Sequence, residues 1–369
     1  MPSARPRPGP HADPLDDQIA RTAQLNAHYE SLAFELGDGD KGRFLSGWQC
    51  VNPYADDFLA RVRARTAALD PVGYSYFDDE RPLVTATLAL HEQLDGQAPP
   101  HAFCGSGATS LLFGFANYLR FLGVQEVLFV PPMYFTFRIA LDRFGIRTTP
   151  VSDVHPFEPG FALNLPMTRG SVLILTDPIW YVGRPVGKAL IDQIAAWQRE
   201  TSSMVLVDGS LQYLGWGGER GEDTAALDPT LTFRLVCPSK QLSVHGYRFA
   251  YVLLPLAHKQ GFAWTYTNMM GPANVASIAF AYEALEHLVT GDIPARLVRQ
   301  VSEAHGRLRA SGAISSPFDP SCGYFVFEQI DAPLPEGYLV VDGRYFEQPR
   351  YPTHVKINLL SPSLSLIDV

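Results

Sequence analysis

The sequence lacks long hydrophobic runs, paired cysteines and recognisable metal-ligand spacings. No apolar run approaches the roughly 18 residues that a membrane-spanning helix needs, and the N-terminal stretch has no apolar segment of the kind found in secretory signals. The four cysteines show no CxxC spacing, and the ten histidines show no HExxH spacing. We therefore expect a cytoplasmic protein with reduced thiols, no bound metal and no membrane partner.

An excess of basic residues is lacking as well. The formal net charge is −9, from 29 Lys and Arg against 38 Asp and Glu, so a nucleic-acid partner is not expected. Hydrophobic residues make up 46% of the 369 residues and charged residues 18%, which is enough for a large buried core. The length predicts one large domain and a smaller one.

The sequence does contain a series of short apolar runs that end at turn residues. These runs cover residues 127–130, 172–175, 204–207 and 235–237. Continuous apolar runs of this kind are typical of strands that are buried on both faces of a parallel sheet. Helical patterns accompany them, at residues 111–121 before the first run and at residues 188–200 between the second and third. The alternation predicts an α/β domain with a mostly parallel sheet flanked by helices, and residues 249–254 are expected to form an antiparallel return strand.

The C-terminal part has a different pattern. A helical pattern at residues 294–309 precedes three short strand patterns, at residues 324–327, 338–341 and 354–359. We expect a smaller α+β domain here, completed by N-terminal residues. The predicted division is an N-terminal arm and part of the small domain at 1–45, the large domain at 46–290, and the small domain at 291–369.

Small or polar residues follow several predicted strands directly. Since ligands of such sheets bind at the carboxyl ends of the strands, we expect these residues to converge. The Gly105-Ser106-Gly107 turn leads into an apolar helix, whose free backbone N–H groups suit a phosphate. A tight turn in which Ser and Thr cap the helix explains the same residues equally well.

Tyr134 and Asp208 follow two further strands. An aromatic ring just past a strand can stack on a flat cofactor ring, although core packing is the commoner fate of a Tyr. A carboxylate at a buried strand end needs a partner, and a protonated ring nitrogen would be one. Capping of the next turn is an equal alternative for Asp208.

Lys240 lies just past the apolar run at residues 235–237, and Arg248 follows eight positions later. A lysine amine can condense with an aldehyde cofactor, and the planar guanidinium of Arg can bind a phosphate through two hydrogen bonds. By itself, this pair is more often part of a solvated loop. The order of Gly-rich turn, aromatic, Asp, Lys and Arg, each after a strand, favours a cofactor site.

With these motifs the sequence resembles the fold-type I pyridoxal-phosphate enzymes of the aminotransferase class I/II family, as a divergent member. The resemblance spans about residues 47–358 and is most specific at Ser239-Lys240 with Arg248, and at Gly323-Tyr324-Phe325. It implies that Lys240 forms the Schiff base with pyridoxal 5'-phosphate and transfers protons at the substrate carbon.

The resemblance also assigns the remaining contacts to the cofactor and the substrate. Asp208 would hold the pyridine nitrogen, and Tyr134 would stack on the ring. Gly47 would line the substrate pocket. Tyr74 would reach the phosphate of a partner subunit, which implies a homodimer. The phosphate contacts would come from Ser106, Gly107 and Arg248, with Ser239 beside them.

The sequence departs from the family pattern around the phenolic oxygen of the cofactor. Trp180 stands where an Asn usually donates a hydrogen bond to that oxygen, and Leu211 stands where a Tyr usually donates a second one. The nearest tyrosine is Tyr213. The Trp180 N–H or Gln212 would have to substitute for the missing donors.

A second departure concerns the substrate. Lys356 stands at the place of the family's carboxylate-binding Arg, and Lys offers a point charge instead of a planar fork. Arg344 or Arg350 would be alternatives, and a surface lysine on an edge strand is an equal interpretation of Lys356.

Together these features predict an enzyme that transforms an amino acid through Lys240, aminotransferase-like, in specialised metabolism. The departures leave β- or γ-elimination, replacement, cyclisation or oxidation as alternative reactions. A scaffold that binds a ligand without turnover is an alternative of another class.

Overall fold

The structure is a computed structural model that describes residues 45–48, 50–77, 80–218, 221–331, 333, 340–346 and 350–364, with the backbone alone at 344 and 345. Every described residue belongs to one compact unit, residues 42–369. The predicted division at residue 290 stays a prediction. None of the described helices is long and apolar enough to cross a membrane.

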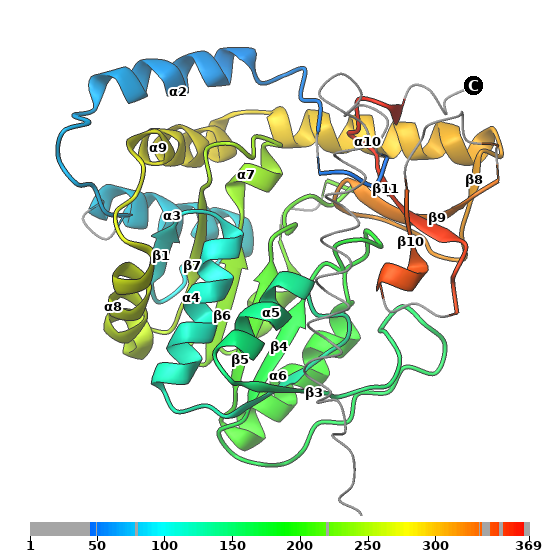
Figure 1. Cartoon of the computed structure of the whole chain (residues 1–369), viewed down its shortest axis with the longest axis horizontal. Helices are drawn as coiled ribbons and strands as arrows, with labels where there is room; N and C mark the ends of the chain where they lie inside the picture. Colours follow the sequence, from blue (N-terminus) through cyan, green and yellow to red (C-terminus); the bar gives the residue numbers. More distant parts are fainter. Residues whose placement is uncertain are drawn as a thin grey trace, which may run out of the picture. The chain divides into compact units, whose positions relative to one another are not determined.

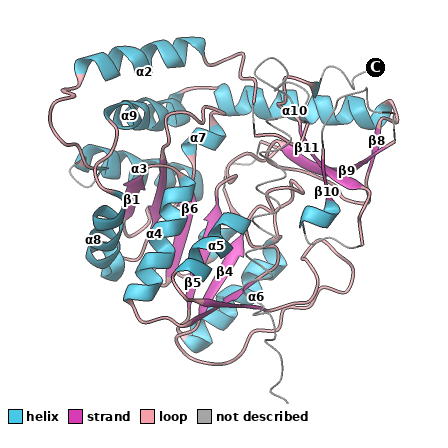
Figure 2. Cartoon of the chain, in the orientation of Figure 1, coloured by secondary structure: helices cyan, strands magenta, loops and turns pink. Residues whose placement is uncertain are grey.

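Seven strands form the large sheet, in the order β1-β7-β6-β5-β4-β2-β3 (Figures 1 and 2). β7 pairs antiparallel with both β1 and β6, and the other pairs are parallel. This confirms the predicted α/β fold and the return strand. The strands are β1 (Ala102–Gly105), β2 (Glu126–Phe129), β3 (Arg147–Pro150), β4 (Val172–Thr176), β5 (Met204–Gly209), β6 (Thr232–Val236) and β7 (Ala250–Leu253).

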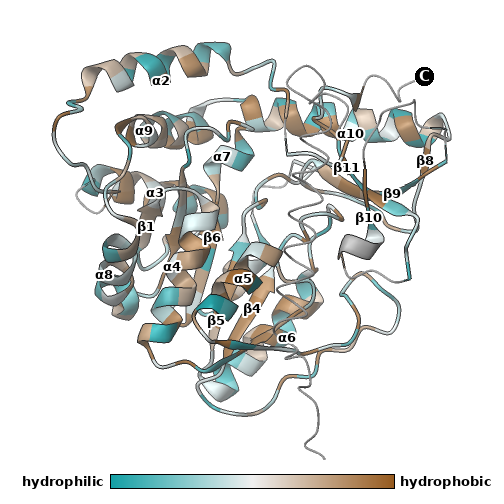
Figure 3. Ribbon diagram, viewed as in Figure 1, coloured by the Kyte–Doolittle hydropathy of each residue, from teal (hydrophilic) through white to brown (hydrophobic). Residues whose placement is uncertain are grey.

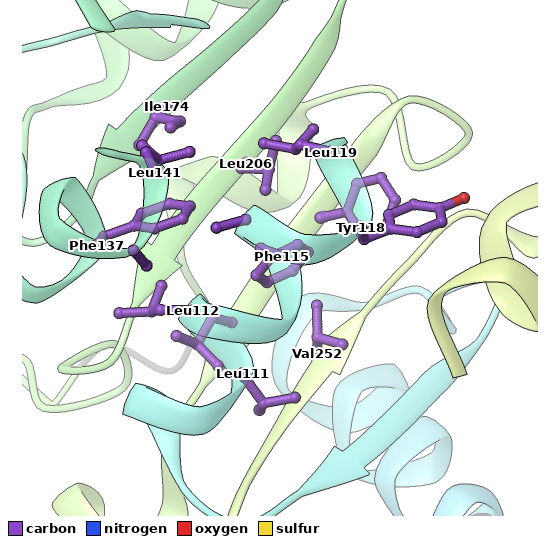
Figure 4. Close-up of a cluster of buried hydrophobic side chains, with 14 of the residues drawn as sticks. Leu111, Leu112, Phe115, Tyr118, Leu119, Phe137, Leu141, Ile174, Leu206 and Val252 are labelled. Atoms are coloured by element: carbon purple, nitrogen blue, oxygen red, sulfur yellow. The ribbon is translucent and has the colours of Figure 1, made fainter. Parts of the chain in front are cut away.

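The central strands are buried on both faces because helices cover the sheet from both sides. Every residue of β4 and β6 is buried, and Figure 3 colours β4 as hydrophobic along most of its length. On one face lie α4 (Ala108–Phe121), α5 (Phe135–Arg143) and α8 (Lys259–Met270). Figure 4 shows Phe115 of α4 and Phe137 of α5 in this cluster. On the other face, α6 (Lys188–Thr201) packs on β4 and β5.

Further helices pack around these layers. α2 (Asp56–Ala68) contacts α9 (Val275–Thr290), and α9 contacts α3 (Arg81–Asp95). The Asn274 side chain accepts a hydrogen bond from the Ala276 N–H and caps α9. α3 ends at Gly96, whose φ of 75° is left-handed. The short helices are η3 (Asp223–Ala226), α7 (Pro238–Gln241), η4 (Leu256–His258) and η5 (Gly343–Phe346).

The second, smaller sheet follows α10 (Ile293–Ala310) in the chain and has the strand order β10-β11-β9-β8. Its paired strands are antiparallel. An N-terminal segment runs along β11, since the Asn358 N–H donates to the Leu45 carbonyl and the Val51 N–H to the Leu360 carbonyl, both over 2.8 Å. The strands are β8 (Ile314–Ser315), β9 (Phe325–Ile330), β10 (Val341–Asp342) and β11 (His354–Asn358).

Candidate active site

A cavity of about 340 Å³ opens at the carboxyl ends of the central strands, within the size range of small-molecule sites. Thr176 ends β4, Asp208 lies at the end of β5, and Cys237 directly follows β6. The predicted convergence of strand ends is therefore present. The lining comprises Trp48, Gly107, Ala108, Thr109, Tyr134, Thr176, Pro178, Trp180, Asp208, Ser210, Leu211, Cys237, Ser239, Lys240, His245, Arg248 and Phe325.

Lys240 lies on the short helix α7 and lines this cavity. Its Nζ lies 4.9 Å from the ring centre of Trp48. Burial lowers the pKa of Lys240 below its ordinary value, and the nearby Arg248 charge acts in the same direction. A lowered pKa increases the neutral, nucleophilic fraction of the amine at neutral pH.

Asp208 places a buried carboxylate in the same cavity, with only 6% of the residue exposed. Burial raises the pKa of Asp208, while hydrogen bonds from Ser210 and the charge of Lys240 lower it. The Ser210 hydroxyl donates to Oδ1 over 2.6 Å and the Ser210 N–H over 3.2 Å. Because both bonds reach Oδ1, Oδ2 remains for a donor in the cavity.

Gly107 and Arg248 form a cradle for an anion at the N-terminus of α4. Gly107 has a φ of 88°, and a Cβ placed there would lie 3.0 Å from Nη2 of Arg248. The lack of a side chain thus lets the guanidinium approach the backbone. No side chain caps α4, so the N–H groups of its first turn add partial positive charge to that of Arg248. Arg248 itself has a left-handed φ of 52°, which is unusual for a residue with a side chain.

Ser239 and Ser106 are placed differently from these two. The Ser239 hydroxyl donates to the Phe249 carbonyl over 2.8 Å and accepts from the Phe249 N–H over 3.1 Å. It therefore ties α7 to the start of β7, although it also lines the cavity. The Ser106 N–H donates to the Tyr266 hydroxyl over 2.8 Å, and Ser106 is not among the described residues that line the cavity.

Four aromatic residues make one wall of the cavity. The rings of Trp48 and Trp180 stack at a centre distance of 5.5 Å, and Tyr134 meets Trp180 edge-on at the same distance. Phe325 packs edge-on against Trp48 at 5.2 Å. Burial raises the pKa of Tyr134 to about 12, so its hydroxyl is a hydrogen-bond donor at neutral pH.

Lys356 is fully buried behind this wall. Its Nζ lies 3.6 Å from the ring centre of Trp48 and 4.0 Å from that of Phe325, and it donates to the Ser46 carbonyl over 3.0 Å. Burial lowers the pKa of Lys356 well below its ordinary value. The interpretation as a surface lysine on an edge strand was wrong, because β11 lies between β10 and β9.

The other residues of the predicted site lie outside the described lining. Gly47 is buried and accepts a hydrogen bond from the Asn358 amide over 3.1 Å, while its neighbour Trp48 reaches the cavity. Tyr74 is 84% exposed. The Arg344 side chain lies outside the described residues. Arg350 lies 3.6 Å from the Glu158 carboxylate.

The two proposed substitutes for the missing phenolic donors differ in position. Trp180 lines the cavity, whereas the Gln212 amide donates to the Thr224 hydroxyl over 2.7 Å and lies away from the lining. Tyr213 is turned to Asp95, to which its hydroxyl donates over 3.0 Å.

Sequence reasoning missed Thr176 and His245. Both line the cavity, and the structure gives no hydrogen-bond partner to the buried Thr176 hydroxyl or to either ring nitrogen of His245. Their positions carried a signal, since Thr176 ends a predicted strand and His245 lies between Lys240 and Arg248.

The sequence matches no family model and no curated protein. Solved structures are similar over nearly the whole chain. N-succinyldiaminopimelate aminotransferase from Mycobacterium tuberculosis has a TM-score of 0.74 at 18% identity, covering 93% of this chain and 95% of its own. YbdL from Escherichia coli, described with a methionine aminotransferase function, has a TM-score of 0.74 at 14% identity, covering 92% and 95%.

Aspartate aminotransferase from Thermotoga maritima is similar as well, with a TM-score of 0.72 at 14% identity, covering 95% of this chain and 98% of its own. The chain therefore has the fold of these aminotransferases.

Proposed function

We propose that the protein is a pyridoxal-phosphate-dependent, aminotransferase-like enzyme that acts on an amino acid. The observation that carries the proposal is the arrangement of Lys240, Asp208 and the Gly107–Arg248 cradle around one cavity. When bound, pyridoxal 5'-phosphate supplies an aldehyde for an amine and a protonated ring that takes up the electron pair released at the substrate carbon.

The described residues fit this cofactor at three points. The Gly107–Arg248 cradle offers a guanidinium and helix N–H groups to a phosphate. Oδ2 of Asp208 suits a protonated ring nitrogen, which would also offset the cost of burying the carboxylate. Tyr134 and Trp180 offer aromatic surfaces beside the ring position.

A donor for the phenolic oxygen is present among the residues that sequence reasoning missed. The Thr176 hydroxyl is buried and unpartnered at the end of β4, and Thr176 pairs in register with Asp208 of β5. We assign Thr176, with the Trp180 N–H, to this contact.

Lys240 holds the reactive amine and, once released, takes the proton from the substrate carbon. Its burial and lowered pKa suit both steps, because a neutral amine is the nucleophile and also the base. Lys240 would also be the residue that returns this proton if the reaction is transamination, the reaction that we put first. Elimination, replacement, cyclisation or oxidation would use the same first proton transfer.

On the substrate side, Lys356 and Arg344 are the proposed partners of a carboxylate. Lys356 contacts Trp48, which lines the cavity, so a shift of one ring would connect the amine with the substrate. Trp180 and Lys356 stand where the family pattern has Asn and Arg. These two departures support the proposal that the substrate belongs to specialised metabolism.

The test is an absorbance spectrum of the protein with pyridoxal phosphate, wild type against Lys240→Ala. A near-visible band that is fixed by borohydride in the wild type and absent from the variant supports the site. The lack of a band in both proteins would refute the cofactor. Mass spectrometry after incubation with amino acids and a keto acid then separates amino-group exchange from loss of a leaving group.

A further inference from the structure

His245 is a polar side chain of the cavity whose hydrogen-bonding capacity is largely unused. It lies in the loop between α7 and β7, and lines the same cavity as Lys240 and Arg248. Both ring nitrogens are buried, and neither makes a hydrogen bond of ordinary geometry among the described residues, although the Ser239 backbone lies near enough to act on the ring. Since a neutral imidazole has one donor and one acceptor, burying both without partners costs free energy.

A second unpartnered group lies next to it. The Tyr324 hydroxyl is buried and has no hydrogen-bond partner, and its ring centre lies 6.3 Å from that of His245. His245 lines the cavity, whereas Tyr324 is not among the described residues that line it. A ligand in the cavity can therefore supply a hydrogen-bond partner to the ring of His245.

The charges around His245 make its basicity depend on what the cavity holds. Burial lowers the pKa of His245 to about 3, the positive charges of Lys240 and Arg248 act in the same direction, and the Ser239 backbone opposes them. Tyr324 faces it from the segment before β9 and is neutral, because burial raises the pKa of Tyr324 well above its ordinary value. Condensation of Lys240 with an aldehyde would weaken the positive charge of its amine. A phosphate bound at Arg248 would offset the charge of the guanidinium. Binding of the cofactor would therefore raise the pKa of the His245 imidazole.

We propose that His245 contacts the substrate and is a second proton acceptor of the site, beside Lys240. This inference rests on the proposed function and deepens it. In the step, a ring nitrogen of His245 uses its lone pair to bond the proton of a substrate N–H or O–H. The electron pair of the broken bond stays on the substrate nitrogen or oxygen, and the proton returns when product forms.

The inference narrows the class of substrate and of reaction. The substrate is an amino acid with a second N–H or O–H group in its side chain, such as a hydroxyl, amino or guanidino group. Transamination needs proton transfer at one carbon, which Lys240 supplies. A second proton acceptor activates a side-chain nucleophile, as ring closure or replacement requires.

The first test is a proton titration of the histidine rings by NMR, with the His245 signal assigned by its loss in His245→Gln. In the cofactor-free protein, we expect a neutral ring down to about pH 5, because the pKa is lowered to about 3. Loading with pyridoxal phosphate should raise this pKa by at least about one unit. An unchanged pKa would overturn the proposal.

His101 provides a matched control for this titration. Burial and the Lys259 charge lower the pKa of His101 to about 4, yet it directly precedes β1, at the end of that strand opposite the Gly107 cradle. Its pKa should therefore not respond to loading. A rise shared by His101 and His245 would point to a change of the whole protein and would count against the proposal.

The second test uses serine, lysine and arginine as probes, because their side chains carry the hydroxyl, amino or guanidino group that His245 would deprotonate, and alanine as the control that lacks one. The reaction rate of the loaded protein against pH should show an inflection that disappears in His245→Gln, since Gln forms hydrogen bonds but does not titrate. The same profile in both proteins would refute the inference while the absorbance band keeps the proposed function. If no band forms at all, both proposals fail together.

Discussion

Arg248 contacts Gly107 so closely that the exact shape of its guanidinium matters. A Cβ at Gly107 would lie 3.0 Å from Nη2, so the fork lies directly on the backbone of the cradle. We predict that Arg248→Lys raises the Kd for pyridoxal phosphate about 10- to 100-fold, because Lys cannot form the two-pronged contact. Equilibrium titration of the absorbance band measures this. Arg147→Lys, at an exposed pair with Glu126, is the control, and equal effects of the two exchanges would contradict the assignment.

Lys240 should react with the cofactor at a lower pH than an exposed lysine. Burial and the Arg248 charge lower the pKa of Lys240 below 10.5, so its reactive neutral form appears earlier as the pH rises. We predict that the rate of cofactor attachment rises with pH through a midpoint below 10.5. Stopped-flow absorbance measurements between about pH 6 and 10 would follow this rate, because that range covers the expected midpoint. If the rate of attachment rises about tenfold with each pH unit over the whole range, the pKa of Lys240 is not lowered, and the prediction is wrong.

At the residue scale, the sequence predicts those site residues whose neighbours in the chain already mark a strand end. Asp208 and Lys240 follow apolar runs, and the cavity contains both. Thr176 and His245 were missed, because what distinguishes them is a lack of partners, and this depends on contacts from distant segments. Ser239 was expected beside the phosphate, but its hydroxyl is bonded to the Phe249 backbone, a contact that no pattern in the sequence indicates.

Arg234 and Asp95 connect β6 to the end of α3 behind the large sheet. The pair is buried, with 7% and 1% of the two side chains exposed, and Asp95 also accepts hydrogen bonds from Tyr213 and contacts His91 over 2.9 Å. We predict that Arg234→Met lowers the free energy of unfolding by about 3–5 kcal/mol, because Asp95 keeps a buried charge without its main partner. Urea denaturation measures the change.

An exposed ion pair provides the control for this exchange. Arg296 and Asp292 pair on α10 with 53% and 61% of their side chains exposed, so Arg296→Met should cost less than about 1 kcal/mol. If Arg234→Met costs no more than that, the buried network does not hold β6 against α3.

At the element scale, the sequence predicted strands wherever an apolar run met a turn. β4, β5 and β6 lie inside the sheet and read as continuous apolar segments. β3 was not predicted, because it is the edge strand, is largely exposed and contains the polar residues Arg-Thr-Thr. The predicted strand at residues 338–341 overlaps β10 at Val341, while residues 338 and 339 lie outside the described residues. The two-residue strand β8 has no pattern of its own and is set by its neighbour β9.

For the whole molecule, the exposed Tyr74 supports a site shared between two subunits. Tyr74 is 84% exposed and its neighbour Val72 is 91% exposed, in a loop between α2 and α3. An exposed aromatic and aliphatic pair on a loop suits contact with a second copy. We predict a dimer of twice the 40.7 kDa chain mass in sedimentation velocity.

Hybrid dimers test whether Tyr74 serves the partner's cofactor. Lys240→Ala subunits lack the reactive amine, and Tyr74→Phe subunits lack the hydroxyl that would reach the other subunit's phosphate. In a mixed dimer, one site combines an intact Lys240 with an intact Tyr74 from the other subunit. Refolded mixtures should therefore bind pyridoxal phosphate with wild-type affinity in that site, whereas each parent variant should not. Mixtures that behave as the average of the two parents would show that each subunit binds its cofactor alone.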